Sequence, residues 1–197
     1  MVDTAVPGSL PRTQQERRQR IIAAAVALLE EGEYDTVQMR DVAERAGVAL
    51  ATIYRYFTSK EHLYAAALLD WAADYPVKGR TLDRSNGGGE ARFRALMRRA
   101  VRAFERHPQM MRALIVLESS NDPNARALFQ EFAKRNVDTL TAALSSMESD
   151  TAAAVVETAN AVMVTRLRSW ALGRCSIRDV DRSVQRALDL IFSYQRL

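Results

Sequence analysis

Residues 38–57 read QMRDVAERAGVALATIYRYF, and this stretch decides the fold. Ala43 stands where two helices would cross, because a larger side chain would push the second helix away. Gly47, four residues later, can adopt the positive φ that a turn of three or four residues requires. Ile53 then returns an apolar contact onto the first helix. The spacing predicts a helix-turn-helix whose second helix, about Leu50 to Tyr56, is of a size to enter the major groove of DNA.

An ordinary helical hairpin is the alternative interpretation, since alanine-rich helices produce this spacing by chance. The residues that follow favour DNA binding. Tyr54, Arg55, Tyr56, Ser59 and Lys60 gather at the end of the short helix and the start of the next. There, hydroxyl groups, cations and the free amides of a helix N-terminus can hold phosphates.

The segment from about Arg17 to Leu69 resembles the TetR family of bacterial repressors, most strongly in residues 37–48 and 52–63. The QMRxVA and YRYF motifs also resemble the repressors of cholesterol and steroid catabolism within that family. The resemblance implies an all-α protein with an N-terminal helix-turn-helix three-helix DNA-binding domain. It also implies a C-terminal helical domain that binds a ligand and forms a dimer.

Individual residues match family positions that contact DNA. Arg40 matches a position that can reach a base edge, where arginine prefers guanine. The turn is followed by Ala49 and Leu50, where family members often carry polar residues. This departure places more weight on Arg40, on contacts with thymine methyl groups and on DNA shape. The residues expected to bind operator DNA are Thr36, Gln38, Arg40, Ala51, Thr52, Tyr54, Arg55, Tyr56 and Lys60.

The composition favours long helices, because the 197 residues include only eight glycines and five prolines. We expect a flexible arm at residues 1–13, a helix-turn-helix DNA-binding domain at 14–58, and an effector-binding and dimerisation domain at 59–197. Thr36 is expected to cap the second helix, and Pro76 to follow the fourth. After a connection at 75–89, the expected helices are 90–106, 108–119, 123–146, 150–172 and a last one, capped by Ser176, that ends near Tyr194.

Positive charge is concentrated in the middle of the chain. Residues 76–110 hold nine Lys and Arg against three Asp and Glu, whereas residues 1–75 hold eight against 11. Bulk charge therefore does not support DNA binding by the N-terminal region. Six arginines at 92, 94, 98, 99, 102 and 106 form either an exposed face or the mouth of a pocket that meets an anionic group. A carboxylate or the phosphates of an acyl-CoA thioester would be such a group.

The C-terminal part is rich in methionine and aromatic residues. At helical spacing these side chains ordinarily fill a core, but methionine also suits irregular apolar cavities. The family resemblance implies an effector between these helices, and we expect a large hydrophobic ligand such as a steroid or a fatty acyl-CoA. The candidate ligand-binding residues are Trp71, Tyr75, Phe93, Met97, Phe104, Met111, Phe129, Phe132, Met163 and Trp170.

The last two expected helices carry wide apolar stripes. One stripe comprises Val156, Ala159, Met163, Leu167 and Trp170, and the other Val180, Val184, Ala187, Leu188 and Ile191. Paired in a homodimer, these helices would form the symmetric arrangement that a palindromic operator requires. The alternative is burial of both stripes within one subunit.

An enzyme and a helical adaptor for protein partners are the alternatives to a gene regulator. His62 and His107 are the only histidines, and neither belongs to an HExxH motif; no GxSxG motif occurs. Neither a metal nor a cofactor is expected. The single Cys175 excludes an internal disulfide and indicates a reducing compartment. The longest apolar run, residues 21–29, is too short to cross a bilayer, so we expect a cytoplasmic protein without membrane contact.

Overall fold

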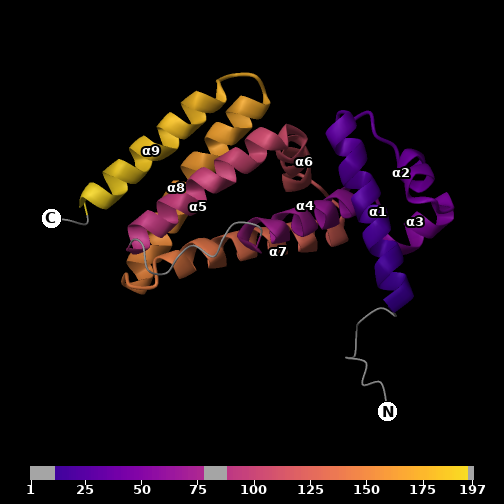
Figure 1. Cartoon of the computed structure of the whole chain (residues 1–197), viewed down its shortest axis with the longest axis horizontal. Coiled ribbons are helices and arrows are strands. Elements are labelled where there is room, and N and C mark those ends of the chain that lie inside the picture. The colour runs from indigo at the N-terminus through magenta and orange to yellow at the C-terminus, as the bar shows by residue number, and fades with distance from the viewer. Residues whose placement is uncertain (1–11, 78–87, 195–197) are drawn as a thin grey trace, which may run out of the picture.

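The computed structural model describes residues 12–77 and 88–194, without the side chains of residues 74–77 and 194. Within these ranges all regular structure is α-helical, as predicted. Figure 1 shows that α1–α3, which we call the N-terminal unit, lie at one end of the molecule, and that α4 joins them to a body of α5–α9. The helices are α1 (Arg12–Glu31), α2 (Met39–Ala46), α3 (Leu50–Tyr56), α4 (Lys60–Val77), α5 (Gly89–Arg106), α6 (Pro108–Glu118), α7 (Pro123–Ala143), α8 (Ser149–Ala171) and α9 (Ile177–Tyr194).

The turn between α2 and α3 depends on Gly47. This glycine has φ 64°, in the left-handed region where other L residues are strained. Its N–H donates to the carbonyl of Glu44 at 3.1 Å, and the N–H of Val48 donates to the carbonyl of Ala43 at 3.0 Å. Ala43 and Ile53 are buried beneath the turn. The predicted helix-turn-helix is therefore confirmed.

The start of α2 differs from the expectation. The predicted cap, Thr36, is wrong: α2 begins after Gln38, and the Thr36 hydroxyl donates to the carbonyl of Glu33 at 2.9 Å. The Asp41 carboxylate accepts the backbone N–H of Gln38 at 2.9 Å. The Asp41 carboxylate thus satisfies the backbone N–H of Gln38 at the start of α2. The Thr36 hydroxyl instead forms a hydrogen bond within the preceding turn.

α4 connects the two parts of the molecule. It packs most extensively on α7 and also contacts α1 and α6. It runs to Val77, so the expectation that Pro76 follows the helix is wrong. Proline lacks the backbone N–H that would donate to the carbonyl four residues earlier. Because α4 ends one residue after Pro76, the helix tolerates the loss of this one hydrogen bond.

The other helix starts follow local hydrogen bonding. The Asp122 carboxylate accepts the N–H groups of Asn124 at 2.8 Å and Ala125 at 3.0 Å, which caps α7 before Pro123. Ser176 caps α9 as predicted, since its hydroxyl accepts the N–H of Asp179 at 3.2 Å. α7 ends at Ala143, three residues before the predicted end.

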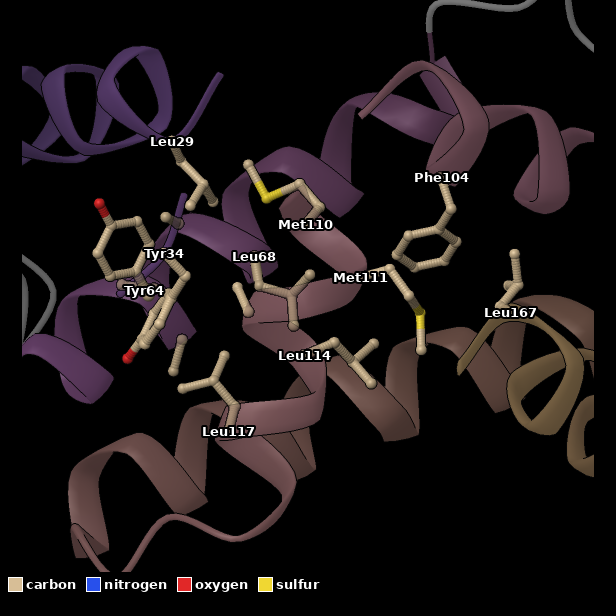
Figure 2. Packing of buried hydrophobic residues seen from close by; sticks show 14 of the residues in the cluster. Leu29, Tyr34, Tyr64, Leu68, Phe104, Met110, Met111, Leu114, Leu117 and Leu167 are labelled. Atoms are coloured by element: carbon tan, nitrogen blue, oxygen red, sulfur yellow. The ribbon is translucent and has the colours of Figure 1, made fainter. Parts of the chain in front are cut away.

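Buried apolar residues of the N-terminal unit and the body form one connected core. Figure 2 shows its central part, where side chains of α1, α4, α5, α6 and α8 meet. A rotation of the N-terminal unit would therefore disturb packing inside the body. Among the described helices, none is both long and apolar enough to cross a membrane. The residues labelled in Figure 2 are Leu29, Tyr34, Tyr64, Leu68, Phe104, Met110, Met111, Leu114, Leu117 and Leu167.

Candidate DNA-binding surface and effector cavity

One face of α2 and α3 presents side chains to solvent. Arg40 is exposed, and its guanidinium lies 3.5 Å from the carboxylate of Asp41. On α3, Tyr54 is 51% exposed and Leu50 is 40% exposed. Ala51 and Arg55 are also exposed, and Thr52 is half-buried. Because Ile53 is fully buried on the opposite side, α3 has a fixed orientation that displays these side chains.

Thr36 and Gln38 lie at the start of this face, and both are exposed. Two further predicted contacts, Tyr56 and Lys60, lie at its border and are half-buried. The Lys60 ammonium donates to the carbonyl of Tyr34 and lies 4.3 Å from the centre of the Tyr34 ring. Burial lowers the pKa of Lys60 from its ordinary value. The Tyr56 hydroxyl is buried without a hydrogen-bond partner among the described residues.

A polar cluster at the α3–α4 junction ties the N-terminal unit to α7. The Thr58 hydroxyl donates to the Asp122 carboxylate at 2.9 Å and accepts from the Asn124 amide at 3.2 Å. The hydrogen bond from the Ala125 N–H is the largest cause that lowers the pKa of Asp122 to about 2, and bonds from the Ser59 and Thr58 hydroxyls and the Asn124 N–H lower it further. Sequence reasoning identified Asp122 as a helix cap. No sequence pattern paired it with a threonine 64 residues away.

A cavity of about 450 Å³ lies in the body between α4, α5, α7 and α8. Five of the predicted ligand-binding residues line it, and these side chains make its wall predominantly apolar. A cavity of this volume is in the range that small-molecule ligands occupy. The five are Trp71, Met97, Phe104, Phe132 and Met163.

Four other predicted ligand-binding residues lie outside the cavity wall. Phe93 packs against Phe192 of α9 with ring centres 6.1 Å apart, and Met111 is buried in the core. Phe129 and Trp170 pack against the core from its edge. The side chain of Tyr75 lies outside the described residues. All ten residues remain predictions as ligand contacts.

Sequence reasoning missed the small residues of the cavity and its polar residues other than Arg99, which belongs to the arginines predicted as a possible pocket mouth. Alanines at 72, 100 and 103 line it, and their short side chains leave the space open. Polar groups come from α5 and α7: Arg99, Arg135, Asn136, Asp138 and Thr139. Small residues among aromatic ones at helical spacing were the available signal. The sequence does not reveal which face of each helix borders the void.

Comparison with known proteins identifies the chain. A model of bacterial regulatory proteins of the tetR family matches residues 21–67, which contain the helix-turn-helix. A model of the tetracyclin repressor-like C-terminal domain matches residues 89–191, which contain α5–α8 and most of α9. The chain belongs to the TetR family.

Relatives of this TetR-family chain include transcriptional repressors. The HTH-type transcriptional repressor KstR of Rhodococcus jostii is 32% identical over 179 residues, which cover 90% of this chain and 84% of KstR. A TetR regulator from Rhodococcus sp. RHA1 matches in structure with a TM-score of 0.76 and 27% identity, over 91% of this chain and 96% of that one. The chain is therefore a DNA-binding transcriptional repressor of the TetR family, and not an enzyme.

The TetR fold is also shared with more distant proteins. FadR of Thermus thermophilus, a repressor whose structure was solved in complex with lauroyl-CoA, matches with a TM-score of 0.74 at 19% identity. The match covers 89% of this chain and 93% of FadR. At this identity the likeness concerns the fold.

Within this TetR-family chain, three arginines of α5 contact other residues or line the cavity, and three are exposed to solvent. Arg94 is paired, since it donates to Glu90 and to Asp189 of α9, each at 2.9 Å. Arg92 donates to the carbonyl of Ala143 at 3.2 Å. Arg99 lines the cavity. The remaining arginines, at 98, 102 and 106, are exposed. Spaced four residues apart, these three share one face of α5.

The apolar stripes of α8 and α9 are largely buried within the chain itself. Seven of the ten residues are buried against other helices of the same subunit, so burial within one subunit, the alternative interpretation, accounts for them. Leu172 and Leu190 instead remain 49% and 66% exposed. In Figure 1, α9 lies along an outer edge of the body. The seven are Val156, Ala159, Met163, Leu167, Val180, Val184 and Leu188.

Proposed function

We propose that this repressor binds a palindromic operator as a homodimer and that a large hydrophobic effector carrying an anionic group releases it. The observation that carries the proposal is the apolar cavity of about 450 Å³, whose wall includes residues of α4. α4 begins directly after the helix-turn-helix. The same helix therefore borders the effector space and supports the surface that faces DNA. The repressor would act in the cytoplasm, where its operator is accessible.

The exposed face of α2 and α3 supports the DNA contacts. Arg40 would reach a base edge, and Thr52 and Tyr54 would contact bases or phosphates. Thr36, Gln38, Ala51 and Arg55 would lie against the backbone or the groove floor. Tyr56 and Lys60 would contact phosphates once DNA draws their polar atoms outward.

Two features support a steroid or a fatty acyl-CoA as the effector. The apolar wall of Trp71, Met97 and Phe104 suits an acyl chain or a fused ring system. Arg99 and Arg135 at the same cavity, with the exposed arginines along α5, suit phosphates or a carboxylate. Two regulators of the same fold, FadR from Thermus thermophilus and FadR from Bacillus subtilis, hold lauroyl-CoA and stearoyl-CoA, respectively.

Effector binding would act through α4. A ligand that fills the cavity would displace side chains such as Trp71 of α4. Because α4 packs closely on α7, α4 would then shift relative to α7. Because α1 also packs on α4, the N-terminal unit changes its position. Two N-terminal units of a dimer would then no longer match the spacing of two half-sites.

The homodimer would form through the outward faces of α8 and α9. Leu190 of α9 and Leu172, directly after the end of α8, are large apolar residues exposed to solvent. We expect Leu190→Glu to convert the dimer to a monomer in sedimentation at micromolar concentration. Val137→Glu, on α7 at 42% exposure, is the matched control and leaves the dimer intact. A wild-type protein that sediments as a monomer would reject the dimer.

The proposal as a whole is tested by recovering DNA bound by the full-length protein from sheared genomic DNA. We expect enrichment of palindromic sites, including the region upstream of its own gene, with affinity that falls steeply as salt rises. A panel of acyl-CoA thioesters, steroids and fatty acids is then screened for a change in melting temperature and in affinity for the recovered DNA. Recovery of random DNA rejects the regulator, and a panel without effect rejects the effector class.

A further inference from the structure

A chain of side-chain contacts leads from the cavity wall to the end of α1. We propose that His107 transmits the state of the cavity to the N-terminal unit, by holding Glu30 of α1 in the arrangement that binds DNA. This inference rests on the proposed function. It names a coupling residue that lies on neither the cavity wall nor the DNA-facing surface.

The first step of this chain is the contact between Trp71 and His107. Trp71 of α4 and Phe104 of α5 both line the cavity, and their ring centres are 5.2 Å apart. On another side, the Trp71 ring lies 5.9 Å from the His107 imidazole with the two planes at 81°. A ligand that displaces the indole therefore acts directly on the imidazole.

His107 is held at a defined place between α5 and α6. The backbone N–H of His107 donates to the backbone carbonyl of Ala103 at 3.1 Å, and Ala103 lines the cavity. Pro108 follows as the first residue of α6 and restricts the backbone at this junction. The backbone of His107 consequently has a fixed position relative to the cavity wall.

The second step is the contact between His107 and Glu30. The imidazole Nδ1 lies 2.9 Å from Oε1 of Glu30, and the two side chains are 31% and 49% exposed. Nearby, Arg112 of α6 donates to Glu33 at 3.2 Å. Glu30 and Glu33 thus link the end of α1 to the body. Glu31, between them in sequence, pairs instead with Arg45 of α2, inside the N-terminal unit.

The protein would thus have two arrangements, which differ in whether His107 contacts Glu30. In the arrangement of this structure, Trp71 supports His107 against Glu30, and this contact holds α1 in place. When a ligand displaces Trp71, the imidazole moves with it and the carboxylate is released. A contact that exists only in the DNA-binding arrangement has a defined thermodynamic consequence: its removal weakens DNA binding and strengthens effector binding.

The test measures both affinities of the full-length protein for Glu30→Gln and His107→Gln. The probes are the DNA upstream of its own gene and lauroyl-CoA. We expect DNA affinity to fall about threefold and lauroyl-CoA affinity to rise by up to the same factor, as befits one partly exposed polar contact. Glu31→Gln is the matched control, because it removes a neighbouring carboxylate whose partner lies within the N-terminal unit. It leaves lauroyl-CoA affinity unchanged.

A merely structural role would give a different result, since local destabilisation lowers both affinities together. Parallel losses in Glu30→Gln, or an unchanged lauroyl-CoA affinity, would overturn the inference. Failure of the wild-type protein to bind lauroyl-CoA would instead reject the fatty acyl-CoA as effector, and failure to bind the upstream DNA would reject that region as its operator.

The contact itself is tested without DNA or ligand by nuclear magnetic resonance. The chain has two histidines, so each imidazole signal is assigned by substituting the other. We expect both Trp71→Phe and Glu30→Gln to shift the His107 signal and to leave the His62 signal in place. A His107 signal that neither substitution moves shows that the chain of contacts is absent, and overturns the inference whatever the protein binds.

Discussion

Ala43 in the N-terminal unit and Ala103 in the body are both buried alanines on helices, but they face different surroundings. Ala43 is 5% exposed and lies in the core beneath the turn of the helix-turn-helix. Ala103 is 2% exposed and borders a cavity of about 450 Å³. The difference shows how one chain meets two demands. A surface that recognises DNA needs a fixed angle between helices, whereas a site for an effector needs space that a ligand can fill.

The largest expected effect comes from placing the same larger side chain at these two positions. Ala43→Leu overpacks the crossing of α2 and α3 and should lower the free energy of unfolding by about 2 kcal/mol. Ala103→Leu extends into the cavity and should change it by less than about 0.5 kcal/mol. Urea unfolding measures both. Equal destabilisation would show that the cavity is not available space, and the comparison would fail.

The next effect concerns which arginines serve DNA recognition. Arg40→Ala should weaken binding to the recovered operator by about 2 kcal/mol and reduce the preference over random DNA, because a base contact is lost. Arg98→Ala removes an exposed arginine of the body and should leave DNA binding unchanged. Titration at fixed salt measures both. An equal loss on operator and random DNA for Arg40→Ala would reject its role in base recognition.

A smaller effect is expected at Asp122, which links the start of α7 to Thr58 at the α3–α4 junction. Asp122→Ala should cost about 1 kcal/mol of stability, through the lost cap of α7 and the lost bond from Thr58. The folded pKa of about 2 lies below the ordinary 3.8, so the carboxylate stabilises the protein above about pH 4. This contribution disappears as the pH falls toward 2.

The role of the Asp122 charge is tested by measuring the unfolding of the wild type and of Asp122→Ala at several pH values. The stability difference between wild type and Asp122→Ala should be constant near neutral pH and should shrink below about pH 4. Asp122→Asn is the control that retains a capping oxygen without the charge. A difference that is independent of pH would show that the carboxylate charge has no role in this link.

The smallest effect is expected for Lys60, where the ammonium lies on Tyr34 in the free protein. Lys60→Ala should weaken binding similarly on all DNA sequences and lower the slope of log affinity against log salt by about one. Arg98→Ala again serves as control and keeps the wild-type slope. An unchanged slope in Lys60→Ala would mean that the ammonium stays on Tyr34 when DNA is bound.

The sequence predicted the N-terminal unit in detail because its geometry is determined locally. Ala43, Gly47 and Ile53 lie within eleven residues, and each has a physical reason for its place in a helix-turn-helix. The local errors have the same origin. Thr36 is a good capping residue, but it competes with the Gln38–Asp41 pair, which begins two residues later, and only the structure decides between them.

The cavity could be predicted only in outline because it depends on the rotation of four separate helices. Met97 and Phe93 lie on one apolar face of α5, yet Met97 lines the cavity and Phe93 packs on Phe192. The same holds for contacts distant in sequence. Nothing in the order of residues pairs Thr58 with Asp122 or His107 with Glu30.

The most direct test of the account is an equilibrium titration of the full-length protein, at one ionic strength, with the DNA upstream of its gene and with a shuffled fragment of the same composition. Each titration is repeated with saturating lauroyl-CoA. We predict a preference of about a thousandfold for the upstream fragment, which lauroyl-CoA diminishes. Equal affinity for the two fragments would contradict the account.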